Sequence, residues 1–341
     1  SLQSQKSKLE ISTAAQALPR FFGSRRLRLY GGSSAPELTQ QIATYLGLEE
    51  PNQAVKKQFS DGELYVKLES SVRGTDVFIV QSTCSPVNDN LMELMLFIDA
   101  CRRAHAAQVT VVIPYYGYAR ADRIVEKREA LSSKLVANLL VKAGTDRVIV
   151  MDIHSPQSCG FYDIPVDHIH GSVPLIQYLK REEAQHLDNM IIVSPDVGGV
   201  ARARHFAKML NDAPLAIIDK RRSAHNVAEV MNLIGDVNGK VAVLVDDMID
   251  TAGTIVAGAK LLREKGAKAV YAMATHAILS GPAVERLSEP GVLEQVIVTN
   301  TIPIPKEKKF EQLREVSVAH VLGEAIWKAH EDFSISGSWV L

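Results

Sequence analysis

The sequence predicts an α/β protein with two domains, each built on a mainly parallel β-sheet that helices flank. Nine short apolar runs recur at intervals that suit strands, and most are continuous, which is typical of strands buried on both faces of a sheet. Segments with helical spacing separate many of these runs. A chain of 341 residues has room for about two domains, and nine strands are more than one compact doubly wound sheet usually holds.

The predicted elements alternate as strand, helix, strand, a repeat with right-handed crossovers. The predicted strands are Leu27–Tyr30, Val77–Val80, Val109–Ile113, Val148–Met151, Met190–Val193, Leu215–Ile218, Val241–Val245, Ala269–Ala274 and Val296–Val298. The predicted helices are Leu91–Ala106, Leu131–Ala143, Val200–Leu210 and Thr254–Lys265. Polar and glycine-rich residues follow the strands, and open α/β sheets bind ligands at that edge. We therefore expect function there.

The domain boundary is expected near Gly171. The N-terminal domain then covers residues 26–170, with the C-terminal segment 320–341 packing on it, and the C-terminal domain covers 171–319. Residues 1–25 are rich in Ser, Gln and Lys with little apolar periodicity. We expect a mobile extension there, with a targeting remnant as the alternative.

Composition excludes several classes of protein. Lys and Arg number 38 against 39 acidic residues, so no overall field attracts nucleic acid or an anionic membrane. No apolar run approaches the ~18 residues of a membrane span. The cysteines Cys84, Cys101 and Cys159 are odd in number and form no CxxC pair, which disfavours a disulfide framework or a thiolate zinc site. We expect a cytoplasmic protein that binds neither nucleic acid nor a membrane.

The strongest chemical signal is the stretch KVAVLVDDMIDTAGT at 240–254, in which a buried strand leads into a helix. Hydroxyls and successive backbone N–H groups at a helix start bind phosphate, and a glycine lets the main chain approach closely. The predicted cradle consists of Asp250, Thr251, Ala252, Gly253 and Thr254. Asp246 and Asp247 suit the vicinal hydroxyls of a sugar, because carboxylates only accept hydrogen bonds. The alternative is that Asp250 caps the helix while the acid pair faces water.

This stretch resembles the ribose-phosphate-binding motif of type I phosphoribosyltransferase folds, and the rest of the chain is similar to the ribose-phosphate pyrophosphokinase family. The matching motifs cover most of the chain. They are FSDGE at 59–63, QSTCSPVNDNLMEL at 81–94, PYYGYARADR at 114–123, MDIHSPQSCGFYDIPVDH at 151–168, SPDVGGVARAR at 194–204, IDKRRSAHNVAEVMN at 218–232 and THAILSGPAVERL at 275–287. The resemblance implies two similar phosphoribosyltransferase-like domains, the first on the ATP side and the second on the ribose 5-phosphate side.

The resemblance implies transfer of the β,γ-diphosphoryl group of ATP to the C1 hydroxyl of ribose 5-phosphate. The products are AMP and 5-phosphoribosyl 1-pyrophosphate, for nucleotide biosynthesis. Lys220 and Arg222 match the catalytic residues, and Arg222 also belongs to the ribose 5-phosphate site with the acid pair and the cradle. Taken without the resemblance, residues 220–222 are a solvated basic turn.

Mg²⁺ is the implied cofactor, and His154 and Asp196 match the family's metal positions. Magnesium prefers oxygen, so the carboxylate is the firmer ligand. The alternatives for His154 are an interior histidine or a transition-metal site. His168 and His170 are expected to be structural.

The implied ATP-binding residues are Phe59, Asp61, Gly62, Glu63, Arg120 and Ala121. In the family, the FSDGE segment reaches the ATP of a neighbouring subunit, which implies a homo-oligomer, a hexamer built from dimers. Taken alone, SDGE is a turn. Many members have Gln at the position of Ala121, and residues 124–127 also depart from the family pattern. Inorganic phosphate and ADP are implied effectors, but these departures leave the allosteric response open.

Two further classes share this fold. A non-catalytic regulatory subunit is disfavoured because the chain keeps Lys220, Arg222, His154, Asp196 and the DTAGT loop. An ordinary phosphoribosyltransferase is disfavoured because it needs no ATP segment. The chain also lacks the GxGxxG pattern of a dinucleotide oxidoreductase and the GxxxxGK[ST] pattern of a P-loop kinase.

Overall fold

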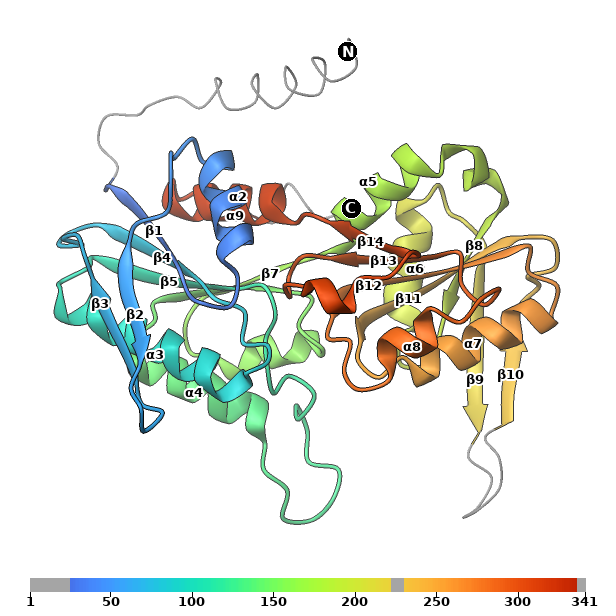
Figure 1. Ribbon diagram of the computed structural model, residues 1–341, viewed down its shortest axis with the longest axis horizontal. Coiled ribbons are helices and arrows are strands. Elements are labelled where there is room, and N and C mark those ends of the chain that lie inside the picture. Colours follow the sequence, from blue (N-terminus) through green and yellow to red (C-terminus); the bar gives the residue numbers. More distant parts are fainter. Residues whose placement is uncertain (1–24, 222–229, 336–341) are drawn as a thin grey trace, which may run out of the picture. The chain divides into compact units, whose positions relative to one another are not determined.

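The structure is a computed structural model that describes residues 25–221 and 230–335 (Figure 1). Contacts divide these residues into two units. The first contains residues 25–169 together with 319–335, and the second contains residues 170–318. The C-terminal helix therefore packs with the N-terminal part of the chain.

The first unit is built on a parallel five-stranded sheet with the order β1-β4-β5-β6-β7. Its strands are β1 (Leu27–Gly31), β4 (Asp76–Val80), β5 (Gln108–Ile113), β6 (Arg147–Met151) and β7 (Val166–Ile169). A separate antiparallel hairpin consists of β2 (Ala54–Gln58) and β3 (Leu64–Leu68). Its β3 strand lies against helix α3 (Val87–Arg103).

The other helices of this unit are α2 (Pro36–Tyr45), α4 (Ser132–Ala143), the short 3₁₀ helix η1 (Pro156–Phe161) and α9 (Ala319–His330). Helix α9 packs against α2. At its end, His330 Nδ1 lies 3.1 Å from Asp76 Oδ2. Both side chains are buried, so this contact ties α9 to the start of β4.

The second unit is built on a seven-stranded sheet with the order β10-β9-β8-β11-β12-β13-β14. Its strands are β8 (Met190–Ser194), β9 (Leu215–Arg221), β10 (Val230–Ile234), β11 (Val241–Ile249), β12 (Ala269–Ala277), β13 (Gln295–Thr299) and β14 (Leu313–Val316). Neighbouring strands are parallel except β9 and β10, which pair antiparallel. The parallel strands therefore end at one common edge.

Helices cover both faces of this sheet. They are α5 (Ser172–Glu182), α6 (Val200–Met209), α7 (Gly253–Glu264) and α8 (Ala283–Leu287), with short 3₁₀ helices η2 (Ala184–Asn189) and η3 (Lys306–Lys308). Strand β11 shows the arrangement clearly. Leu244 packs in a core with Ala259 of α7, whereas the next residue, Val245, packs in another core with Phe206 of α6. Burial on both faces explains why this strand is a continuous apolar run.

The expected fold class, an α/β protein with two mainly parallel sheets flanked by helices, is confirmed. Each predicted strand and helix is present in the described residues. Strands β2, β3, β7, β10 and β14 were not predicted, because each contains at least one polar residue that interrupts its short apolar run. None of the described helices is long and apolar enough to cross a membrane.

Candidate active site

The acid pair lies near the carboxyl end of β11, at the ligand-binding edge of the second unit's sheet. The Asp246 side chain is 22% exposed and the Asp247 side chain only 5%. Asp246 Oδ1 also accepts the backbone N–H of Asp247 at 2.9 Å. Asp246 is therefore the more accessible carboxylate of the pair.

One arginine contacts both carboxylates. Arg202 of α6 donates from Nη1 to Asp246 Oδ1 at 2.9 Å, and its Nη2 lies 3.3 Å from Asp247 Oδ1. Burial is the main cause that raises the pKa of Asp246, and the neighbouring Asp247 adds to it, whereas the Arg202 charge lowers it. The acid pair thus depends on a cation that the motif itself does not contain.

The predicted cradle forms the connection between β11 and α7. Helix α7 begins at Gly253, and Ala252 occupies the N-cap position with a left-handed backbone, φ +61°. Because this N-cap is an alanine, the N-cap residue of α7 supplies no side-chain cap. Backbone N–H groups at the start of a helix can bind a phosphate.

Asp196 follows β8, the strand beside β11. Its Oδ1 accepts the N–H of Gly199 at 2.8 Å, and Ser194 Oγ donates to its carbonyl oxygen at 2.7 Å. The side chain is exposed. A fixed, exposed carboxylate at a strand end suits a hard cation.

The predicted catalytic residues are described only in part. Lys220 lies near the end of β9, where its backbone is in register with Met231 of β10. Arg222 lies outside the described residues. The structure therefore gives the strand from which the basic segment starts, and no side-chain geometry for it.

In the first unit, the FSDGE segment is the turn between β2 and β3. The Phe59 N–H donates to the Glu63 carbonyl at 2.8 Å, and Gly62 has a left-handed backbone, φ +94°. Phe59 is 44% exposed and meets Tyr65 edge-on, with ring centroids 6.1 Å apart. Lys57 Nζ lies 4.9 Å from both ring centroids. The hairpin therefore presents, at its exposed tip, an aromatic ring that contacts both Tyr65 and Lys57.

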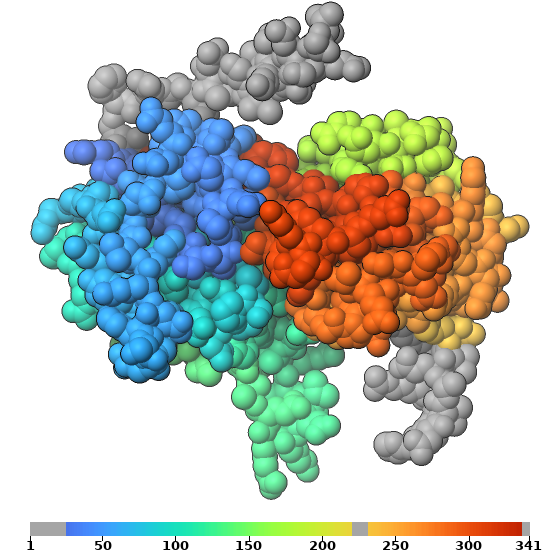
Figure 2. Space-filling model, viewed as in Figure 1, coloured from blue at the N-terminus to red at the C-terminus, as the bar shows by residue number. Residues whose placement is uncertain are grey.

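Arg120 and Ala121 lie in the loop that leads to α4. The Ala121 N–H donates to the Tyr118 carbonyl, and the Ala121 carbonyl accepts from the Ser133 N–H. Arg120 is exposed. The loop that follows projects from the surface of the first unit (Figure 2), and its Ile124 and Val125 are 62% and 74% exposed.

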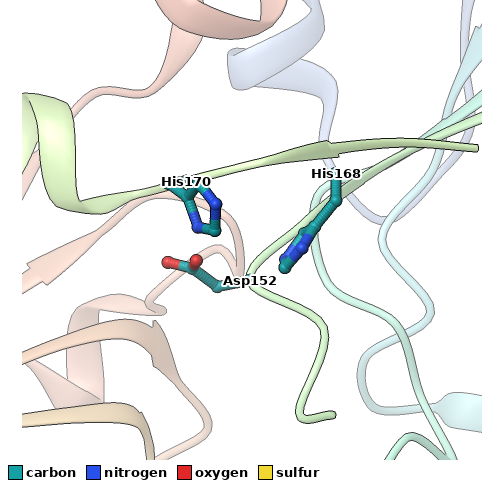
Figure 3. Close-up of side chains that lie close together, drawn as sticks. All are labelled: Asp152, His168 and His170. Atoms are coloured by element: carbon teal, nitrogen blue, oxygen red, sulfur yellow. The ribbon is translucent and has the colours of Figure 1, made fainter. Parts of the chain in front are cut away.

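Metal-ligating residue types also come together at the ends of β6 and β7, where His170 is the first residue after the boundary of the first unit. Ligand atoms of Asp152, His168 and His170 lie within 4.8 Å of one another (Figure 3). His168 lies in β7, His170 directly follows it, and the Asp152 N–H donates to the Ile169 carbonyl at 3.0 Å. The expectation that both histidines are structural stays a prediction, and the grouping adds a geometry that could hold a metal ion. The signal for this group was the H-x-H spacing, since residues two apart on a strand share a face.

His154 is exposed, so its alternative reading as an interior histidine is wrong. Asp196 and His154 belong to different units, and each is described within its own unit.

The group of Asp152, His168 and His170 offers two imidazole nitrogens and one carboxylate. That donor set suits a transition metal better than Mg²⁺, which prefers oxygen ligands.

Comparison with known proteins assigns the family. Residues 27–144 match the family described as the N-terminal domain of ribose phosphate pyrophosphokinase, and residues 221–339 match the phosphoribosyl synthetase-associated domain. A ribose-phosphate pyrophosphokinase of Synechococcus elongatus is 61% identical, over 94% of this chain and 96% of that protein. The chloroplastic ribose-phosphate pyrophosphokinase 2 of Arabidopsis thaliana is 58% identical, over 94% of this chain and 82% of that protein.

A solved structure agrees with these relatives. The phosphoribosylpyrophosphate synthetase of Mycobacterium smegmatis is 42% identical and superimposes with a TM-score of 0.85, covering 90% of this chain and all of that one. The chain therefore belongs to the ribose-phosphate pyrophosphokinase family, and its activity is that of a ribose-phosphate diphosphokinase that makes phosphoribosyl pyrophosphate.

Proposed function

We propose that the second unit binds ribose 5-phosphate through the acid pair and the loop of residues 250–254. The observation that supports this most is the common strand edge that carries both features. The loop and the start of α7 bind the 5-phosphate through backbone N–H groups and the hydroxyls of Thr251 and Thr254. Asp246 and Asp247 accept hydrogen bonds from the ribose 2- and 3-hydroxyls, which orients the C1 hydroxyl for attack.

The basic segment that starts at Lys220 meets the triphosphate in this proposal. Attack by the C1 hydroxyl on the β-phosphorus forms the new P–O bond and breaks the bond to the α-phosphate oxygen, so that AMP leaves. Lys220 and Arg222 neutralise charge that develops on the transferred group. Arg222 additionally contacts the ribose 5-phosphate.

Mg²⁺ is proposed as the cofactor, with Asp196 as its protein carboxylate and His154 as a weaker ligand. The Asp196 carboxylate fits the oxygen preference of this ion, because the Gly199 N–H fixes it while it stays exposed. When bound, the ion neutralises charge on the phosphates of ATP.

The first unit is proposed to bind the nucleotide. Phe59 stacks on adenine, and the carboxylates of Asp61 and Glu63 accept its exocyclic amine. Gly62 allows the tight turn, and Arg120 and Ala121 complete the nucleotide site. The exposure of the Phe59 ring and its contacts with Lys57 and Tyr65 favour stacking of adenine on this ring.

A homohexamer built from dimers is proposed as the assembly, with the hairpin of one copy at the ATP of another. Met92 of α3 and Leu135 and Leu139 of α4 are 48%, 55% and 39% exposed. These helices pack against each other, so they offer an apolar surface to a second copy. Gel filtration with light scattering tests this assembly, and an active monomer would contradict it.

Inorganic phosphate and ADP are proposed effectors, and a cytoplasmic location is proposed for the protein. The exposed loop with Ile124 and Val125 departs from the family pattern, so titration of both effectors on the purified enzyme decides the response. Imaging of the full-length tagged protein decides the location, since one similar relative is named chloroplastic.

The central experiment incubates the purified protein with ATP, ribose 5-phosphate and Mg²⁺. Phosphorus NMR should show AMP and a diphosphate on C1 appearing together. Lys220→Ala should lower turnover by about 100-fold or more with little change in ribose 5-phosphate affinity. ADP as the nucleotide product would refute β-attack, and absence of AMP would instead favour the regulatory-subunit alternative.

A further inference from the structure

The Arg202 side chain contacts both members of the acid pair and so joins them to another element. A single side chain from outside β11 therefore reaches both carboxylates. Helix α6, which follows the adjacent strand β8, supplies it. A planar guanidinium with several donors can make such a double contact, whereas an ammonium cannot make it in the same way.

The three side chains of this contact are largely shielded from solvent. The side chains of Arg202, Asp246 and Asp247 are 26%, 22% and 5% exposed. Two adjacent carboxylates in such a place repel each other, and burial disfavours their charged forms. Removing the cation would therefore favour uptake of a proton by the pair and would remove a contact that orients both side chains.

Arg202 also joins two parts of the site. Helix α6 begins at Val200, directly after the segment in which the Gly199 N–H holds Asp196. Because Arg202 lies within the first turn of the same helix, its contact with Asp246 links the position of the Asp196 segment to the end of β11. A shift of the Asp196 segment would therefore move the end of β11 through the first turn of α6 and the Arg202 contact.

We propose that Arg202 is a positioning residue. It holds the two carboxylates in the orientation that the ribose hydroxyls require, and it fixes their position relative to Asp196. This role rests on the proposed assignment of Asp246 and Asp247 to ribose 5-phosphate. Arg202 is not assigned a contact with the reacting atoms. It acts through the acid pair, and its loss should affect binding of the sugar phosphate before it affects the nucleotide.

The test compares Arg202→Gln and Arg202→Lys with Arg204→Gln, a control on the same helix whose side chain is exposed. Arg202→Gln should raise the KM for ribose 5-phosphate and its Kd by calorimetry at least about tenfold, while the KM for ATP changes less than about twofold. Arg202→Lys should recover part of this loss. Arg204→Gln should match the wild type.

A second measurement separates positioning from a purely structural ion pair. Because Arg202 acts through both carboxylates, the triple variant Arg202→Gln/Asp246→Asn/Asp247→Asn should bind ribose 5-phosphate no worse than Asp246→Asn/Asp247→Asn. Additive losses would overturn the proposal. So would an unchanged Kd in Arg202→Gln, or equal losses for both substrates that follow a lower thermal midpoint.

A third measurement tests the role of Arg202 without substrate, so that it does not depend on whether the acid pair binds ribose 5-phosphate. Carbon NMR of the Asp246 carboxyl in the full chain reports its titration without any substrate. Arg202→Gln should move this titration to higher pH than in the wild type, and an unmoved titration would overturn the positioning role. A wild-type protein that binds no ribose 5-phosphate, but shows the shift, would refute only the proposed ligand of the pair.

Discussion

Arg286 of α8 donates from Nη1 to the carbonyl oxygen of Thr251 at 2.9 Å, which fixes the turn that leads into α7. The same guanidinium passes close to the start of the helix, since a Cβ built on Gly253 would lie 3.2 Å from Nη1. The loop proposed to bind the 5-phosphate is therefore held from outside by a cation 35 residues away in the sequence. That cation also adds positive potential where a phosphate would lie.

Replacing Arg286 should therefore weaken ribose 5-phosphate binding without affecting ATP. Arg286→Gln should raise the Kd for ribose 5-phosphate by about three- to tenfold, because a loop anchor and a nearby charge are lost together. Calorimetry in the absence of nucleotide measures this. Lys265→Gln removes an exposed cation just beyond the other end of α7 and serves as the matched control. Equal effects of both variants would contradict the local role of Arg286.

Ala252 should show opposed effects on stability and binding. Its left-handed backbone costs an L-residue about 1–2 kcal/mol relative to the right-handed form, and glycine avoids most of that cost. Ala252→Gly should therefore raise the free energy of unfolding by up to about 1 kcal/mol and weaken ribose 5-phosphate binding, because the free loop becomes less fixed. Urea unfolding and calorimetry measure the two effects.

The control for this prediction is Ala201→Gly, at an exposed position inside α6. Glycine costs about 1 kcal/mol within a helix, so the sign of the stability change should be reversed there. Destabilisation by both glycine substitutions would show that the backbone at Ala252 is not strained.

The acid pair predicts that ribose 5-phosphate affinity falls when the pH is lowered. Burial and the neighbouring Asp247 raise the pKa of Asp246 to about 7. Below this pKa the carboxyl binds a proton and loses acceptor capacity for a sugar hydroxyl. Affinity should therefore rise with pH through this range and level off above it.

Calorimetry between pH 5.5 and 9 tests the prediction against Asp246→Asn, which does not titrate. The phosphate of the ligand also titrates, and comparison of the two proteins removes its contribution. The stability change has the opposite sign, because a raised carboxyl pKa means that the folded state holds the proton more tightly than the unfolded state. Stability from this group is therefore greatest at acidic pH and is lost as the pH rises through its folded pKa. Identical pH slopes for affinity in both proteins would refute the role of Asp246.

The sequence predicted those parts of the fold whose signal is contiguous. Strand β11 is an apolar run because both of its faces are covered, and its end carries the acid pair in consecutive positions. Strand β2 was missed because three of its five residues are polar, and β3 because Lys67 interrupts its apolar run and alternate residues are exposed. Functional residues could thus be predicted where a single strand or loop contains all of them.

The supporting arginines could not be found in the same way. Arg202 and Arg286 reach the site from 44 and 35 residues away, and only the folded sheet brings α6 and α8 to its edge. Asp152 likewise meets His168 through the pairing of β6 with β7. Ala252 was assigned to the cradle by its place in the motif, but its left-handed backbone follows from the turn geometry. The arginine contacts and the approach of Asp152 to His168 depend on tertiary structure, which no local pattern encodes.

A shared nucleotide site predicts that two inactive variants restore activity when their subunits mix. Phe59 lies at an exposed hairpin tip, whereas Lys220 lies in the other unit of the chain. Phe59→Ala removes the stacking ring, and Lys220→Ala removes the catalytic cation of the proposal. If the hairpin serves a neighbouring copy, a mixed dimer contains one site with both residues intact. Random reassembly should then recover about one quarter of wild-type turnover at ATP concentrations below KM.

The experiment unfolds and refolds the two variants together and separately, and follows AMP formation in each sample. Lys220→Ala refolded with the double variant Phe59→Ala/Lys220→Ala is the control, because no mixed pair then contains an intact site. It should show no recovery. If the hairpin served the ATP of its own chain, every chain in the mixture would carry one defect, and the mixed sample would be no more active than the average of its components. That result would refute the shared site while leaving the ribose 5-phosphate residues of the second unit unaffected.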